Sequence, residues 1–405
     1  MKILFYNHTG LVSGAERSLM LAIGATDRDV FDMAVVCPAD GALMPTVREL
    51  GLEWLPIDSL ESRFTWNPLS LGRYCLSVAK VKNRFGEIVR RVQPDLIHAN
   101  SVRAGIVASL ATSGMNIPVV WHIRDLLRRH PISSLIRRYA YGSKHTHLLA
   151  ITQATADAFK GGSKSEKSIE VLLNAIDVQR FKFDQNVRSE MRRKFEIGKD
   201  QLVVGIVGQV TPWKGQLGLI RAFRQVAVAA PDALLLIVGS PLFNKDKLYQ
   251  EKLVSETTRL GLDERVRFLG QQENVQHVMQ AFDLLVLNSW AEPFGLVIVE
   301  GMALGLPVLA TNAGGVPEIL KHGESGWLTP PKDDGALAGS IGTLLRNGGV
   351  RSRIGQRAKN QAWRRFSING YASKLADYHH KVLSDHSTPA TSVVTPSQTG
   401  ERVKA

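Results

Sequence analysis

Residues 284–305 read LLVLNSWAEPFGLVIVEGMALG, and this stretch decides the fold. Its first four residues form an apolar run with the length of a buried strand, and a polar loop follows them. We expect Pro293 in the first turn of the next helix, where its missing N–H costs nothing. Phe294, Gly295 and Leu296 would then open that helix. The free N–H groups and the positive dipole end of a helix start form a binding site for phosphate.

Two acidic residues lie eight positions apart around this phosphate site, Glu292 in the loop and Glu300 inside the helix. Carboxylates do not bind phosphate, but they accept hydrogen bonds from hydroxyl groups, as an acidic residue does from a ribose. Two carboxylates around an anion site therefore suggest a ligand with sugar hydroxyls on both sides of a diphosphate.

Short apolar runs alternate with amphipathic stretches along the rest of the chain, which is typical of βα units and parallel sheets. Two series of strands are expected, each with the size of one doubly wound α/β domain. The expected strands are Lys2–Tyr6, Asp32–Val36, Leu96–His98, Val119–His122 and His147–Ile151, then Leu202–Val207, Ala233–Val238, Val266–Leu269, Leu284–Leu287 and Pro307–Ala310. Two such domains in tandem leave a ligand-binding cleft between the carboxyl ends of their strands.

The domain organisation follows from these series. We expect one doubly wound domain over residues 1–185 and a second over residues 186–383. Residues 384–405 are rich in Ser, Thr, Pro and Gln, which predicts a disordered tail.

Two further glycine-containing loops follow expected strands. Residues 208–216, GQVTPWKGQ, carry glycines that free backbone N–H groups and a cation, Lys214, that suits phosphate. Residues 10–17, GLVSGAER, form a second turn of this kind, with Gly14 leading into a helix. His122 ends a third strand, so we expect it to face the cleft.

The segment Glu292–Glu300 resembles the E-x7-E motif of retaining glycosyltransferase family 4, and the glycines and prolines up to residue 328 follow that family's order and spacing. The resemblance implies the GT-B fold, with two Rossmann-like domains facing each other across a cleft. It implies that residues 1–185 bind the acceptor and residues 186–383 bind the nucleotide sugar, with the last helices packing back on the first domain. It implies retaining transfer of a hexosyl-type sugar from a UDP- or GDP-sugar to a lipid-linked or polysaccharide acceptor, in cell-surface glycan synthesis. No metal or other cofactor is implied.

Residue roles come from the same resemblance. Glu300 would bind the ribose, Glu292 the sugar hydroxyls, and His122 would shape the reaction centre. The implied catalytic residues are His122, Lys214 and Glu292, and the implied donor-binding residues are Gly14, Gln209, Lys214, Glu292, Phe294, Gly295, Leu296 and Glu300. Two positions depart from the family pattern: Gln209 stands where an Arg is usual, and Ser13 replaces the first Gly of a Gly-Gly-x-Glu element.

The charge is uneven. The chain has 405 residues and a net charge of +13, and residues 63–144 hold fourteen Lys or Arg against three acidic residues, a net charge of +11. A patch of this kind suits an anionic partner. In residues 126–139, basic residues flank an apolar patch, which predicts docking on an anionic membrane surface. The residues expected at this membrane or acceptor surface are Arg128, Arg129, Arg137 and Arg138.

The remaining composition points to a reducing, cytoplasmic setting. The apolar runs are far shorter than the roughly 20 residues of a membrane span, and the first residues read as a strand rather than a secretory signal. The only two cysteines, Cys37 and Cys75, cannot form a disulfide framework. We therefore expect a cytoplasmic protein, peripheral on the cytoplasmic face of the membrane.

Three other functions stay open at this point. A GT-B-like nucleotide-sugar 2-epimerase would share the ligand, an inactive transferase would explain Gln209 and Ser13, and a nucleic-acid-binding protein would use the basic stretch. Zinc-finger spacing and an RNP-like aromatic motif are both missing, so no nucleic-acid partner is expected. The paired histidines His145 and His147, and His379 and His380, lack a partner cluster for a metal.

Overall fold

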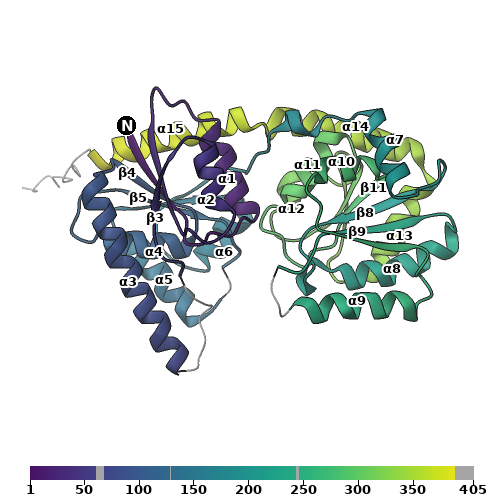
Figure 1. The fold of residues 1–405 in the computed structure, drawn as a ribbon, viewed down its shortest axis with the longest axis horizontal. Helices are drawn as coiled ribbons and strands as arrows, with labels where there is room; N and C mark the ends of the chain where they lie inside the picture. Colours follow the sequence, from purple (N-terminus) through teal and green to yellow (C-terminus); the bar gives the residue numbers. More distant parts are fainter. Residues whose placement is uncertain (61–67, 128, 243–245, 388–405) are drawn as a thin grey trace, which may run out of the picture.

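The computed structural model describes residues 1–60, 68–127, 129–242 and 246–387, and two parallel sheets lie side by side in them (Figure 1). Within those residues, the first sheet has seven strands in the order β3-β2-β1-β4-β5-β6-β7, and the second has six in the order β10-β9-β8-β11-β12-β13. In each sheet the first strand of the domain lies in the interior, and later strands are added on both sides of it. This is the doubly wound arrangement. The predicted α/β fold with two such domains is confirmed.

Strands and helices alternate as the periodicity predicts. The first half contains β1 Lys2–Tyr6, α1 Gly14–Gly24, β2 Asp32–Cys37, α2 Leu43–Glu49, β3 Glu53–Pro56, α3 Pro68–Val92, β4 Leu96–Ala99, α4 Val102–Ala111, β5 Val119–Ile123, α5 Pro131–Gly142, β6 Thr146–Ala150, α6 Gln153–Lys160, β7 Ile169–Val171 and η1 Val178–Phe181. The second contains α7 Gln185–Lys194, β8 Val203–Val207, η2 Pro212–Lys214, α8 Gln216–Ala229, β9 Leu234–Val238, α9 Lys247–Arg259, β10 Val266–Gly270, α10 Val275–Val278, η4 Met279–Ala281, β11 Leu284–Leu287, α11 Leu296–Leu304, β12 Val308–Thr311, α12 Val316–Ile319, β13 Trp327–Thr329, α13 Asp334–Arg346, α14 Gly348–Arg365 and α15 Ile368–Ser387.

Three short strands are not anticipated by the sequence pattern. β3, β7 and β13 have only three or four residues and lie at sheet edges. Edge strands are half exposed, so they lack the apolar runs of the central strands, which are covered on both faces. The central strand β1 illustrates the contrast, because residues 4 and 6 pack on one face of the sheet and residues 3 and 5 on the other.

The last helix crosses back to the first sheet. α15 follows the second domain in the chain but lies over the first (Figure 1), where Tyr371 and Leu375 pack with Ile3 and Phe5. Its helical conformation continues to Ser387, so the expectation of a disordered tail from residue 384 is wrong for the first four residues, because they extend the helix. Residues 388–405 of that tail lie outside the described residues.

The two sheets place the predicted loops at equivalent positions. β1 and β4 are neighbours, as are β8 and β11, and at each pair the strand order reverses. Ligands of open α/β sheets bind beside the carboxyl ends of the strands at this switch point. The loops 7–13, 208–215 and 288–295 all start there. Among the described residues, no helix is long and apolar enough to cross a membrane.

Candidate active site

Glu292 and Lys214 form the centre of the site in the second domain. The Lys214 Nζ lies 2.6 Å from Glu292 Oε2, and the hydroxyl of Ser289 donates to the same oxygen at 2.9 Å. Both side chains of the ion pair are largely buried. Lys214 follows β8 and Glu292 follows β11, so the switch point of the sheet brings the predicted cation and the predicted acid together.

The backbone around Glu292 is held by glycines. Gly314 has φ +61°, and a Cβ there would lie 2.1 Å from the carbonyl oxygen of Glu292, so only glycine fits. The next residue, Gly315, donates its N–H to that carbonyl at 2.8 Å. The glycine pair that follows β12 therefore fixes the position of the acid that follows β11.

The start of α11 differs from the prediction. The helix begins at Leu296, and Gly295 is its N-cap residue with φ +91°. Pro293 lies before the cap, so its predicted place in the first helical turn is wrong: with Gly295 in the left-handed conformation as the cap, the helix begins three residues later, at Leu296. The ring of Phe294 is buried in the core against Phe366, which leaves only its backbone available to a ligand.

Glu300 lies inside α11 and is buried. Burial raises the pKa of its carboxyl, and the nearby guanidinium groups of Arg17 and Arg180 partly offset this effect. Arg17 Nη1 of α1 lies 3.7 Å from Glu300 Oε1. An arginine of the first domain therefore faces an acid of the second, a contact that the sequence pattern does not reveal.

The starts of α1 and α11 face each other across the domain boundary. A Cβ on Gly14 would lie 3.3 Å from Leu296 Cδ1, so the two helix starts are in contact. Ser13 caps α1 and exchanges hydrogen bonds with Glu16, since the Glu16 carboxylate accepts from the Ser13 N–H at 2.9 Å and from its hydroxyl at 2.5 Å. The S-x-x-E spacing of a capping box explains why serine stands where the family has glycine.

Further bonds join the domains beside these helix starts. The Thr152 hydroxyl donates to the Pro293 carbonyl at 2.9 Å. The carboxylate of Glu318 accepts from the N–H groups of Gln153 and Ala154, at 2.7 and 2.8 Å. Glu318 thus caps α6 of the other domain, a role that no local sequence signal indicates because the residues are 164 and 165 positions apart.

Gln209 does not stand free in the cleft. Its side-chain amide donates to Asp246 at 3.3 Å, and the Thr211 hydroxyl donates to the other oxygen of that carboxylate at 3.3 Å. A neutral amide thus lies beside a carboxylate at the position where the family's arginine would add a positive charge.

His122 lies at the carboxyl end of β5, is fully buried and has no exposed surface. Its Nδ1 lies 3.0 Å from His98 Nε2 and 3.2 Å from Arg124 Nη2. Burial, with Arg124 and two neighbouring histidines, lowers the pKa of its imidazole well below the usual value. Its Nε2 is also buried and has no hydrogen-bond partner within the described structure.

Comparison with known proteins decides the family. The family described as Glycosyltransferase Family 4 matches residues 12–180, and the family described as Glycosyl transferases group 1 matches residues 187–361. The D-inositol 3-phosphate glycosyltransferase of Corynebacterium jeikeium is 31% identical over an alignment of 312 residues. This alignment covers 73% of this chain and 73% of the relative. The chain belongs to glycosyltransferase family 4.

The solved structures agree with this family. HepE of Anabaena, in complex with UDP and glucose, is 32% identical with a TM-score of 0.80, over 94% of this chain and 99% of that chain. A further relative is the N-acetyl-alpha-D-glucosaminyl L-malate synthase of Bacillus anthracis, 25% identical over 79% of this chain and 84% of its own. The family 4 glycosyltransferase therefore has the predicted GT-B fold.

The basic surface of this glycosyltransferase is smaller than the sequence predicts. Arg129 and Arg138 are exposed, and Leu135 between them is 68% exposed. Arg137 is instead buried, and its guanidinium donates to the carbonyls of Leu127, Ala158 and Phe159, so its expected place on the membrane surface is wrong. The turn of α5 points this residue inward, where it satisfies the carboxyl end of α6. Arg128 lies outside the described residues.

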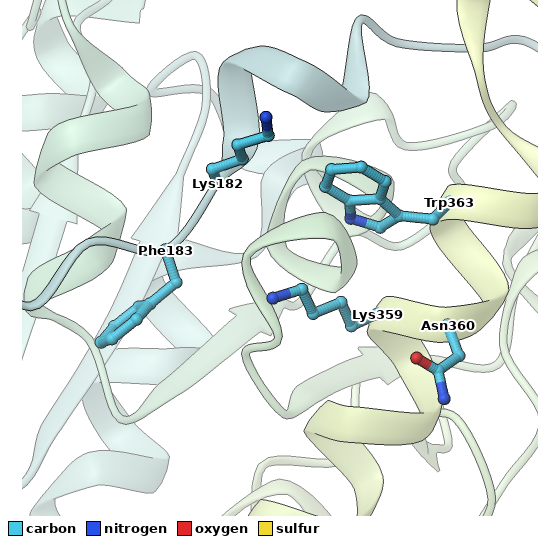
Figure 2. Close-up of a pocket in the computed structure, with 5 residues that line it drawn as sticks. All are labelled: Lys182, Phe183, Lys359, Asn360 and Trp363. Atoms are coloured by element: carbon cyan, nitrogen blue, oxygen red, sulfur yellow. The ribbon is translucent and has the colours of Figure 1, made fainter.

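One open hollow of about 470 Å³ lies away from the predicted site. Figure 2 shows Lys359, Asn360 and Trp363 on α14, and Lys182 and Phe183 on the segment after η1. The hollow contains none of the glycosyltransferase's predicted site residues. Among the described residues, no group of three or more His, Cys, Asp or Glu side chains could hold a metal ion.

Proposed function

We propose that this glycosyltransferase transfers a hexosyl group, with retention, from a UDP-sugar to a lipid-linked or polysaccharide acceptor on the cytoplasmic face of a membrane. The observation that carries the proposal is the position of two acids around one helix start. Glu292 lies in the loop before α11 and Glu300 inside it, and Lys214 contacts the first acid at 2.6 Å. This arrangement fits a diphosphate that lies between two sugars.

The uridine base is supported by the Anabaena relative. One crystal structure of HepE holds UDP and glucose, and another holds UDP-glucose. HepE is 31–32% identical to this chain, and the match covers 94% of this chain. Glu300 would accept hydrogen bonds from the ribose of the UDP-sugar, and Glu292 from hydroxyls of the sugar.

The reaction needs stabilisation of a leaving diphosphate. The bond between the anomeric carbon and the phosphate oxygen breaks, and its electrons stay on the diphosphate. Lys214 and the first N–H groups of α11 would stabilise this charge, which is the main electrostatic contribution to such a reaction. The acceptor oxygen attacks the same face of the sugar, and its proton goes to the leaving phosphate. We propose that no metal or other cofactor takes part.

Thermal unfolding with UDP, GDP, ADP and CMP tests the donor site. A ligand that binds only the folded chain adds about 2.7 kcal/mol of stability at a hundredfold excess over its Kd. We expect UDP to raise the Tm of the wild type, and Glu300→Gln to reduce this shift strongly. Glu324→Gln, an exposed acid in the same domain, is the matched control and should keep the full shift.

Product analysis separates the proposal from its rival. Incubation of UDP-glucose with a glycan or lipid-linked acceptor should release UDP and lengthen the acceptor with unchanged anomeric configuration. A 2-epimerase would instead change the configuration at the sugar's second carbon and leave the acceptor untouched. A UDP shift without any acceptor product would support an inactive transferase.

The membrane site rests on exposed side chains of two helices. Leu76 of α3 and Leu135 of α5 are 73% and 68% exposed, and Arg90 and Arg138 are exposed on the same two helices. Basic residues near an anionic bilayer contribute about 1 kcal/mol each, and apolar side chains can enter its interface.

Vesicle sedimentation tests this membrane site. The double variant Arg129→Glu and Arg138→Glu should bind vesicles with anionic lipid at least tenfold more weakly than the wild type. The control carries the same charge change on α14, as Arg353→Glu and Arg364→Glu, and should bind as the wild type does. Equal loss in both double variants would mean that net charge alone attracts the protein, and the site would be wrong.

A further inference from the structure

Three histidines from distant parts of the chain form a buried row in the first domain. His98 lies on β4, His122 on β5 and His379 on α15. His98 Nδ1 lies 2.9 Å from His379 Nε2, and His98 Nε2 lies 3.0 Å from His122 Nδ1. None of the three side chains has more than 2% of its surface exposed. Both ring pairs meet edge to face with centroids 5.1 Å apart.

Arg124 sets the direction of the hydrogen bonds in this row. A guanidinium can only donate, and Arg124 Nη2 lies 3.2 Å from His122 Nδ1. The Nδ1 of His122 must therefore be unprotonated, and its proton must be on Nε2. Arg124 cannot turn away, because its Nε donates to Asn100 at 2.7 Å and its Nη1 to Asn174 at 3.1 Å.

The proton position on His122 then fixes the donor in each of the two histidine pairs. An unprotonated His98 Nε2 would place two lone pairs 3.0 Å apart, so His98 must donate from its Nε2, and the single lone pair of His122 Nδ1 is shared between this N–H and that of Arg124. His98 Nδ1 is then an acceptor, and His379 must donate to it from its own Nε2. All three rings thus carry one proton on Nε2. Burial lowers the pKa of each imidazole, that of His379 to about 3, which agrees with three uncharged rings.

The end of the row is a donor without an acceptor. The Nε2 of His122 is buried and has no partner in the described structure. Leaving such a group unsatisfied costs about 1–3 kcal/mol, so this N–H needs an acceptor that the described structure does not supply and that a bound ligand can provide. The neighbouring strand β6 is followed by Thr152, which contacts the second domain, so the carboxyl ends of β5 and β6 lie at the edge of the first sheet that meets the second domain.

We propose that His98 and His379 are positioning residues that, together with Arg124, hold His122 as an Nε2–H donor to an oxygen of the donor sugar. This inference rests on the proposed function, because the ligand is the UDP-sugar. It adds that the last helix of the chain, which crosses back from the second domain, takes part in setting the proton position of a residue in the first.

Two substitutions at His98 separate positioning from packing. His98→Gln keeps an amide N–H where Nε2 donates to His122, whereas His98→Leu keeps the bulk but has no donor. We expect Leu to lower kcat about tenfold with the KM for the UDP-sugar within about twofold, and Gln to stay within about threefold of the wild type. His379→Leu should lower kcat in the same direction, and His380→Gln, at an exposed neighbour, should not.

Nitrogen-15 NMR of the labelled wild type provides a readout that does not depend on turnover. The His122 ring should show one protonated nitrogen, Nε2, at neutral pH, and His98→Leu should broaden or split this signal. A proton on Nδ1, or a doubly protonated ring, would overturn the inference. Equal kcat in His98→Leu and the wild type would also overturn it and leave only a packing role. A wild type without transferase activity but with the expected signals would contradict the proposed function and not the proton arrangement.

Discussion

At the scale of single residues, the ribose-binding role that we propose for Glu300 comes with a cost in stability. Its carboxyl is buried in α11 and its pKa is raised by burial, although Arg17 lies 3.7 Å away. An acid whose pKa is higher in the folded state stabilises the fold at low pH and loses that contribution as the pH rises through the folded-state pKa. At neutral pH the charged Glu300 is therefore less favourable to folding than a neutral residue of the same shape.

We predict that Glu300→Gln stabilises the ligand-free enzyme while it weakens UDP binding. The gain should be about 1 kcal/mol at pH 7.5 and should shrink as the pH falls toward the normal range of a glutamate. Urea unfolding of both proteins at a series of pH values measures it. A loss of stability at pH 7.5 would mean that the Arg17 contact outweighs burial.

At the scale of elements, the start of α6 depends on an acid from the other domain. Glu318 accepts hydrogen bonds from the N–H groups of Gln153 and Ala154, and the negative charge lies at the positive end of the helix dipole. Within α6 itself, Thr152 supplies the cap. The acid therefore binds the first helical turn and the domain boundary at once.

We predict that Glu318→Ala lowers the free energy of unfolding by about 1 kcal/mol and speeds hydrogen exchange at Gln153 and Ala154. The amides of α8, in the other domain, serve as an internal reference and should exchange as in the wild type. Unchanged exchange at the two capped amides would show that Thr152 alone holds the helix start.

The elements of the site were predictable where the pattern is local. Strand length predicts the apolar run of β11, the strand-loop-helix order predicts where the acids at 292 and 300 lie, and the glycine-containing loop after β8 predicts where the cation at 214 lies. The sequence predicts the start of α11 too early, because a proline suits the first turn of a helix. The boundary instead lies at Gly295, whose left-handed backbone makes it the cap. Arg137 was misplaced because charge alone does not show which side of α5 faces the core.

At the scale of the whole molecule, two doubly wound domains follow from the alternation of apolar and amphipathic stretches. Contacts between distant residues do not, because no periodicity encodes them. The Arg17–Glu300 contact, the Glu318 cap and the row from His98 to His379 each join segments far apart in the sequence. The first two exist only once the carboxyl ends of both sheets have come together, and the histidine row forms only once α15 has crossed back to the first sheet.

The return of α15 has a mechanical consequence. The chain passes between the domains twice, and the two passages are bonded to each other: Ile176 N–H donates to Phe366 O at 3.0 Å, and Ile368 N–H donates to Ile176 O at 3.0 Å. The two bonded passages form a single pivot between the domains. Rotation about the two passages would separate the domains by breaking the interdomain hydrogen bonds of Thr152 and Glu318, whereas sliding one domain past the other would also break the bonds between the passages.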